Sequence, residues 1–170
     1  MSDVVTDARG KAVSWQDPAI LGAAALDLSG RDFMQAIADG RLPPPPMAEL
    51  IGARLVSVGD GEAHFVCAPD ESTYNPLGTV HGGLLSTLLD FAMGAAVHTR
   101  LPAGVGFTSI EIKVSFLKAL RADGAEIEVH GRALRVGKQV AFAEAHARNG
   151  GGELVGHGTS SIAVIAPRDG

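Results

Sequence analysis

The chain has little cysteine, no excess of positive charge and no long uninterrupted apolar run. Its single cysteine, Cys67, cannot form a disulfide within the chain, so we expect a cytoplasmic protein. A net charge of −5 argues against a nucleic-acid partner, because such partners usually require a basic surface. The longest apolar run, residues 84–97, is interrupted by Ser86, Thr87 and Asp90 and is too short to cross a bilayer comfortably, so we expect no membrane partner.

Several local catalytic motifs are also missing. No G-x-S-x-G stretch is present, so a serine-hydrolase mechanism has no obvious nucleophile. The six histidines form no H-E-x-x-H and Cys67 stands alone, so we expect neither a metal site nor another cofactor. The glycines at 150–152 predict a turn, because no strand–turn–helix context surrounds them.

The length of 170 residues and the 46% apolar content suit one globular domain with a short extension. Residues 1–46 are expected to form this N-terminal extension. It would contain two short helices, within residues 18–28 and 30–40, and a stiff proline-rich connector over residues 42–46. Residues 47–170 would form the main domain.

The main domain reads as strands, one helix and then more strands. Alternating residues on both sides of Gly59-Asp60-Gly61 predict a hairpin, and the apolar stretch 82–99 predicts a helix buried on most faces. Four further strands are expected within residues 106–120, 124–136, 139–149 and 153–166, joined by turn-like segments as an antiparallel meander. This order predicts an α+β fold in which a strongly curved antiparallel sheet wraps around one long helix.

A lone carboxylate, Asp90, lies in the middle of this apolar helix. Gly83, Thr87, Asp90 and Gly94 share one stripe of the helix, and the other faces are apolar. Asp90 is therefore expected to be partly buried, which is costly unless the carboxylate is paired or used. Two interpretations stay open here: a structural aspartate that bonds neighbouring hydroxyls, or a functional one.

The helix opens with His81, Gly82 and Gly83. Two glycines leave the first backbone N–H groups unshielded, and the helix dipole favours negative charge there, although the same residues also suit a simple tight loop. Eight residues separate Gly82 from Asp90, which is roughly 12 Å along a helix. An oxyanion donor and a base must each lie about 3 Å from the reacting carbonyl. Both groups can therefore act in one reaction only if two copies of the helix lie side by side, as in a two-fold dimer.

Asn75, His81, Gly82, Gly83 and Asp90, in the pattern N-x-x-G-x-x-H-G-G with an acid nine positions after the histidine, resemble the hot-dog-fold thioesterases of the phenylacetic-acid-pathway (PaaI-like) group. The resemblance covers roughly residues 48–166. It implies that the N–H of Gly82 polarises a thioester carbonyl and that the partner's Asp90 activates water as a general base, or else acts as the nucleophile. Asn75 and His81 would shape the loop and help place carbonyl or water, and Gly83 would belong to the substrate-binding surface.

The resemblance also implies a serine or threonine on the following strand that positions water. Thr108 and Ser109 both lie near the matching place, and the sequence does not choose between them. Some relatives carry threonine where this chain has Gly94, which is expected to leave extra room.

Coenzyme A carries phosphates, so an acidic protein that binds it should place cations at the pocket mouth. Arg135 and Lys138 are the first candidates, followed by Lys118 and Arg121, although for any one of them a solvated surface position is the favoured interpretation. The N-terminal helices either cap the acyl pocket, through residues such as Phe33, or cover an exposed face of the dimer; we favour the second.

Together these features predict an acyl-CoA thioesterase with coenzyme A as part of its substrate. It would be a homodimer at least, and the resemblance implies a homotetramer built from two dimers. A non-catalytic acyl-CoA binding or sensing module is the main alternative, against which the retained Asp90 argues. A hot-dog dehydratase or hydratase fits less well, because it would be expected to carry a different histidine motif.

Overall fold

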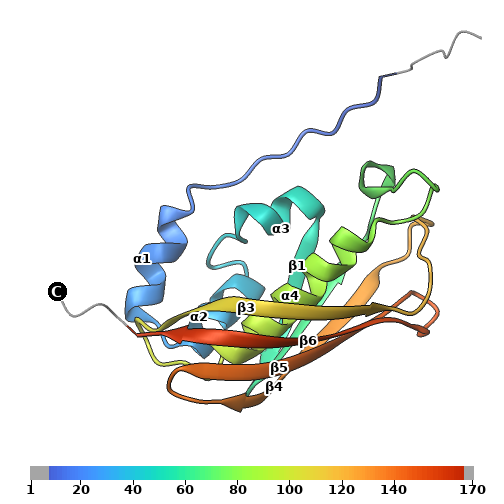
Figure 1. The fold of residues 1–170 in the computed structure, drawn as a ribbon. Helices are drawn as coiled ribbons and strands as arrows, with labels where there is room; N and C mark the ends of the chain where they lie inside the picture. The colour runs from blue at the N-terminus through green and yellow to red at the C-terminus, as the bar shows by residue number, and fades with distance from the viewer. Residues whose placement is uncertain (1–7, 167–170) are drawn as a thin grey trace, which may run out of the picture.

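A six-stranded antiparallel sheet curves around one long helix, α4 (Gly82–His98), in the computed structural model, which describes residues 8–166 (Figure 1). This confirms the fold class predicted from the sequence. The strands are β1 (Ala53–Gly59), β2 (Glu62–Cys67), β3 (Gly106–Phe116), β4 (Ile127–Val136), β5 (Val140–Arg148) and β6 (Leu154–Ile165). The other helices are α1 (Ala19–Asp27), α2 (Gly30–Ala38), α3 (Pro46–Ile51) and the 3-10 turn η1 (Glu71–Thr73).

The strand order is β1-β2-β4-β5-β6-β3. The predicted hairpin of β1 with β2 and the antiparallel run β4-β5-β6 are confirmed, but the expected pairing of β3 with β4 is wrong, because β3 pairs with β6 at the far edge. Residues 117–126 connect β3 to β4 and contain the turn-like segment that had suggested a hairpin. This connection is too long for a tight hairpin, so β3 is free to become an edge strand.

Helix α4 lies against the concave face of the sheet and is the centre of the core. Leu88, Leu89 and Met93 have no exposed surface. The helix approaches β4 so closely at Gly131 that a Cβ atom there would lie 2.1 Å from the carbonyl oxygen of Ala92. This close approach requires glycine and fixes how α4 sits on the sheet.

The two predicted N-terminal helices are present as α1 and α2, and α2 packs against β1 and α4. The third helix, α3, is not expected from the sequence, because a run of prolines normally stops a helix. Pro46 lies at the first helical position, where proline is tolerated since the N–H it lacks would have no helical partner. The expected boundary after residue 46 therefore falls inside α3, which packs against β1. Within residues 8–166 no helix is long and apolar enough to span a bilayer.

Candidate functional site

Asp90 and Ser109 meet where α4 faces strand β3. Asp90 is half-buried, as expected, and the Ser109 hydroxyl donates a hydrogen bond of 2.6 Å to Asp90 Oδ1. The register of β3 shifts between Ser109 and Glu111, and such bulges commonly re-aim side chains beside functional sites. Of the two hydroxyl residues that the sequence left open, Ser109 is the one bonded to the carboxylate, while Thr108 is exposed beside it.

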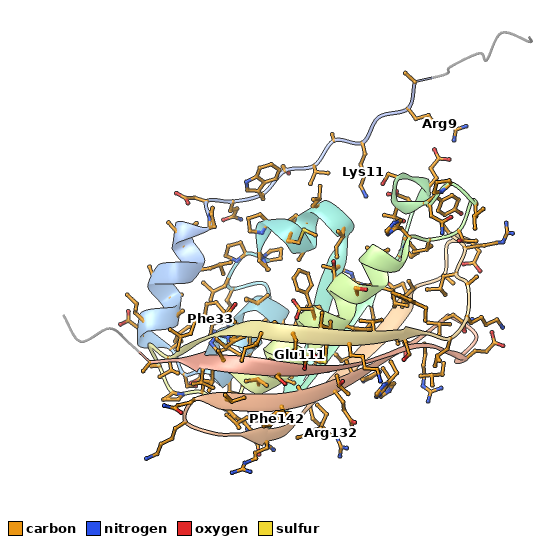
Figure 2. The ribbon with its side chains drawn as sticks, in the orientation of Figure 1. Arg9, Lys11, Phe33, Glu111, Arg132 and Phe142 are labelled. Atoms are coloured by element: carbon orange, nitrogen blue, oxygen red, sulfur yellow. The ribbon has the colours of Figure 1, made fainter. Side chains whose placement is uncertain are left out.

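Asp90 and Ser109 lie in a cavity of about 490 Å³ whose remaining lining is largely apolar. Helix α2 and the proline connector form one of its walls. Figure 2 shows Phe33 on the α4 side of the sheet and Phe142 on the opposite side. The N-terminal helices thus line the Asp90 cavity, while a role for them on the dimer surface stays a prediction. The lining includes Leu21, Phe33, Met34, Ile37, Pro44, Pro45, Phe65, Phe91, His98 and Phe107.

The extra room expected at Gly94 is filled by an aromatic ring. A Cβ atom at Gly94 would lie 2.6 Å from Cε2 of Phe107, so this ring takes the place of a side chain on the helix. His98 packs between Phe33 and Phe107, with ring centroids 5.2 Å apart in each pair. Burial lowers the pKa of His98, which favours the neutral imidazole in this apolar surrounding.

The first turn of α4 presents an unoccupied backbone donor. The N–H of Gly83 donates to Nδ1 of His81 at 2.8 Å, so His81 caps the helix. Within residues 8–166 the N–H of Gly82 has no hydrogen-bond partner. A Cβ atom at Gly82 would lie 3.0 Å from the ring of Phe116, so glycine both admits this ring and leaves the N–H accessible.

Asn75 holds the loop that leads into α4. Its Oδ1 accepts hydrogen bonds from the N–H groups of Leu77 and Thr79, at 2.9 and 3.3 Å, and its Nδ2 donates to the Thr79 hydroxyl at 2.8 Å. The amide of Asn75 therefore holds the loop together through three hydrogen bonds. Asn75 and Gly82 line a separate cavity of about 440 Å³.

The two halves of the predicted site lie apart within one chain. The cavity of Asp90 and the cavity of Gly82 share no lining residue, and eight residues of α4 separate the two groups. An acid and an oxyanion donor that must meet at one carbonyl therefore cannot both come from the same chain.

The predicted coenzyme A cations are divided between distant places. Lys118 lines the Gly82 cavity and is paired with Glu153 at 2.6 Å, and Arg121 lines the adjoining cavity. Arg135 lies on β4 and Lys138 in the connection of β4 to β5. Neither residue lines the Asp90 or the Gly82 cavity. The structure therefore places the second-ranked candidates, not the first, near the N-terminal end of α4.

Phe107 and His98 were not identified from the sequence as lining residues. For His98 a signal existed, because Asp90, Gly94 and His98 follow one another at intervals of four residues and so share a helix face. For Phe107 no local pattern points to the helix, since its position depends on β3 lying over α4.

Comparison with known proteins agrees with this architecture. A family model described as "Thioesterase superfamily" matches residues 77–156. "Putative esterase PA0474" of Pseudomonas aeruginosa is 36% identical over 107 residues, which cover 62% of this chain and 78% of that protein.

Solved structures share the fold. The conserved protein PA5202 of Pseudomonas aeruginosa is 31% identical with a TM-score of 0.67, and the match covers 72% of this chain and 95% of that one. The PaaI protein of the phenylacetic acid degradation operon of E. coli is 20% identical with a TM-score of 0.70, over 83% of this chain and 98% of that one.

Proposed function

We propose that this chain, which belongs to the thioesterase superfamily and has the hot-dog fold, hydrolyses acyl-CoA thioesters to a free acid and coenzyme A. The family membership and the PaaI-like neighbours confirm the resemblance read from the sequence and support a thioester hydrolase in general. The acyl-CoA substrate and the roles of individual residues are inferred from the site. The observation that carries the proposal is the carboxylate of Asp90, held by Ser109 at the wall of a largely apolar cavity.

Asp90 acts as the general base in this proposal. A carboxylate fixed by the Ser109 hydroxyl presents its remaining lone pairs in a defined direction, and Ser109 also helps to orient the water. Water attacks the thioester carbonyl as its proton passes to Asp90. The C–S bond then breaks, and the leaving thiolate of coenzyme A recovers that proton. Direct attack by the carboxylate, forming an anhydride that water then cleaves, is the alternative route.

Gly82 stabilises the oxyanion. Its N–H is free of partners in the described chain and lies at the positive end of α4, where negative charge is favoured. Because Asp90 of the same chain is too far away, the donor and the base of one site come from two protomers.

Strand β3 is the natural place for this dimer contact. It is an edge strand, and Ile110 and Phe116 are 59% and 58% exposed, which is unusual for an edge without a partner. If two copies of β3 pair antiparallel, the Ser109 end of one strand lies beside the Phe116 end of the other. Since Asp90 accompanies Ser109 and Gly82 accompanies Phe116, such a dimer brings each Asp90 towards the partner's Gly82. A tetramer would join two such dimers.

The cavity chemistry favours a bulky apolar acyl group. Aromatic and aliphatic side chains, among them residues of helix α2, make up most of the lining of the Asp90 cavity. Lys118, beside Gly82, and Arg121 are the cations best placed for the phosphates of coenzyme A.

The test is thiol release from benzoyl-, phenylacetyl-, hexanoyl- and lauroyl-CoA by the wild type and by Asp90→Asn. We expect the variant to lose hydrolysis and to keep acyl-CoA binding, while Asp27→Asn, an exposed change at the end of α1, behaves as the wild type. Binding without hydrolysis by the wild type would instead favour a non-catalytic acyl-CoA binding module.

A further inference from the structure

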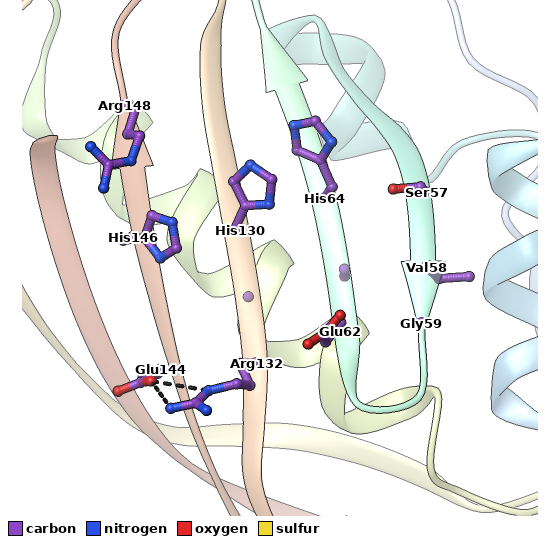
Figure 3. A pocket seen from close by; sticks show the side chains of 12 residues that line it. Ser57, Val58, Gly59, Glu62, His64, His130, Arg132, Glu144, His146 and Arg148 are labelled. Carbon is purple, nitrogen blue, oxygen red and sulfur yellow. Dashed lines mark hydrogen bonds and ion pairs between the residues drawn. The ribbon is translucent and has the colours of Figure 1, made fainter. Parts of the chain in front are cut away.

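A second cavity, of about 580 Å³, opens on the other face of the sheet and is lined by a row of histidines. His64 on β2 is the cross-strand neighbour of His130 on β4. His130 is in turn the cross-strand neighbour of His146 on β5 (Figure 3). His157 on β6 continues the row as the neighbour of His146. Four of the six histidines in the chain therefore lie on four different strands and form one line across the sheet.

This row faces away from the candidate catalytic site. Successive residues of a strand point to opposite faces, and the next residue pair, Ala63 and Gly131, lies on the side of α4, where Gly131 meets the carbonyl of Ala92. The histidine side chains therefore point to the convex face. Nothing in the proposed hydrolysis uses them.

The side chains at one end of the row converge. The rings of His64 and His130 are stacked, with centroids 4.0 Å apart and planes inclined by 9°. Three possible ligand atoms lie within 4.8 Å of one another: one ring nitrogen of His64, one of His130 and a carboxylate oxygen of Glu128. His64 Nε2 is buried and has no hydrogen-bond partner among residues 8–166. A buried nitrogen without a partner is costly, so it calls for an explanation.

The charges around the cluster are compatible with a bound cation. Of the two arginines of the cavity, Arg132 is paired with Glu144 at 2.6 Å. Arg148, the cross-strand neighbour of Glu128, points one guanidinium nitrogen to the carbonyl of Gly152 at 2.8 Å and keeps its positive charge. An imidazole nitrogen whose lone pair has no hydrogen-bond partner can bind a metal ion.

We propose that His64, His130 and Glu128 bind a divalent transition-metal ion of the zinc type on the convex face of the sheet. Imidazole nitrogens combined with a carboxylate oxygen are a donor set that zinc accepts readily. Ligand atoms around tetrahedral zinc lie about 3.3 Å apart. Because the two rings are nearly parallel, both rings and the exposed Glu128 side chain must turn to aim their lone pairs at one ion. Water or His146, the next ring in the row at 5.4 Å from His130, supplies the remaining position.

The test is a zinc titration of the metal-free, full-length protein near neutral pH, in competition with a chromophoric chelator. We expect one zinc ion per chain, and at least a tenfold loss of affinity, about 1.4 kcal/mol, in His130→Gln. The matched control is His157→Gln, which removes a histidine from the same row but outside the three-residue cluster, and we expect it to bind zinc as the wild type does. Absence of stoichiometric zinc binding, or equal affinity in both variants, would overturn the proposal.

Glu128→Gln provides a second variant that changes only an exposed side chain. It should weaken zinc binding, and cobalt(II) bound to the wild type should show visible bands of a nitrogen- and oxygen-ligated ion that change in the variant. Zinc binding that survives both His130→Gln and Glu128→Gln would mean that the ion sits elsewhere on the protein. Neither the zinc affinity nor the cobalt(II) spectrum depends on thioester hydrolysis. Both therefore test the metal site even if the chain proves not to hydrolyse thioesters.

Discussion

The hydroxyl of Ser109 donates a 2.6 Å hydrogen bond to Asp90, and this bond ties the edge strand β3 to the central helix α4. It gives the half-buried carboxylate a partner without neutralising its charge. A carboxylate that is fixed yet still charged is suited to accept a proton from water. The same bond places the carboxylate next to the strand through which we propose that two protomers pair.

Loss of the Ser109 hydroxyl should impair turnover more than binding. In Ser109→Ala, Asp90 loses its fixed orientation, and we expect kcat to fall by about 10- to 100-fold with KM little changed. Steady-state thiol release measures both. Thr108→Val is the matched control, because Thr108 lines the same cavity but is not bonded to Asp90. An equal loss in both variants would argue against a special role for Ser109.

The N-terminal helix α2 should influence acyl selectivity. Phe33 lines the Asp90 cavity, so Phe33→Ala enlarges it, and we expect KM for phenylacetyl-CoA to rise by about 10-fold as apolar contact is lost. Phe142→Ala removes a phenyl ring from the opposite face of the sheet and serves as the matched control. If the two variants have the same acyl profile, α2 does not contact the substrate.

Stability should decrease in mild acid partly because of His98. Burial lowers the pKa of this group from its ordinary value of 6.5. Below that value the unfolded chain binds a proton that the folded chain excludes, so the free energy of unfolding falls as the pH falls. His64 and His146 are shifted in the same direction. Urea unfolding at a series of pH values should therefore show a shallower decline for His98→Leu than for the wild type, and identical slopes would contradict the assignment.

Cys67 should be unreactive in the folded protein. It is buried, its thiol donates to the carbonyl of Ile51, and burial raises its pKa to about 11. Because the thiolate is the reactive form, iodoacetamide should label Cys67 only after unfolding. Mass spectrometry of native and urea-unfolded samples measures this, and rapid labelling of the native protein would show that the pocket around Cys67 opens.

Local patterns in the sequence predicted much of the fold and the elements of the site. The buried helix around Asp90 and the hairpin at Gly59-Asp60-Gly61 both depend on neighbouring residues, so periodicity and turn chemistry reveal them. The pairing of β3 with β6 depends instead on which edge of the sheet is free, a property of the whole fold.

What the sequence did not reveal depends on contacts between distant segments. The choice of Ser109 over Thr108 follows from the register shift after Ser109, which no local signal marks. The ring of Phe107 over Gly94 and the Phe33 wall of the cavity likewise join separate elements. The sequence did not reveal the histidine row for the same reason. Metal motifs are recognised by short spacing, whereas His64 and His130 lie on different strands.

The central claim, that each site takes Gly82 from one protomer and Asp90 from the other, is tested most directly by mixing two inactive variants. Asp90→Asn removes the base, and Gly82→Val shields the polarising N–H, because even a Cβ atom there meets Phe116. Gly82→Ala replaces the valine variant if its unfolding transition shows that it does not fold. The two chains are refolded together and thiol release is compared with that of each variant alone.

In a mixed dimer the unaltered Gly82 of one chain faces the unaltered Asp90 of the other, so one of its two sites is intact. Random mixing should therefore restore about a quarter of the wild-type activity per chain. If both groups acted within a single chain, no chain in the mixture would carry an intact site, and the mixture would remain as inactive as its components.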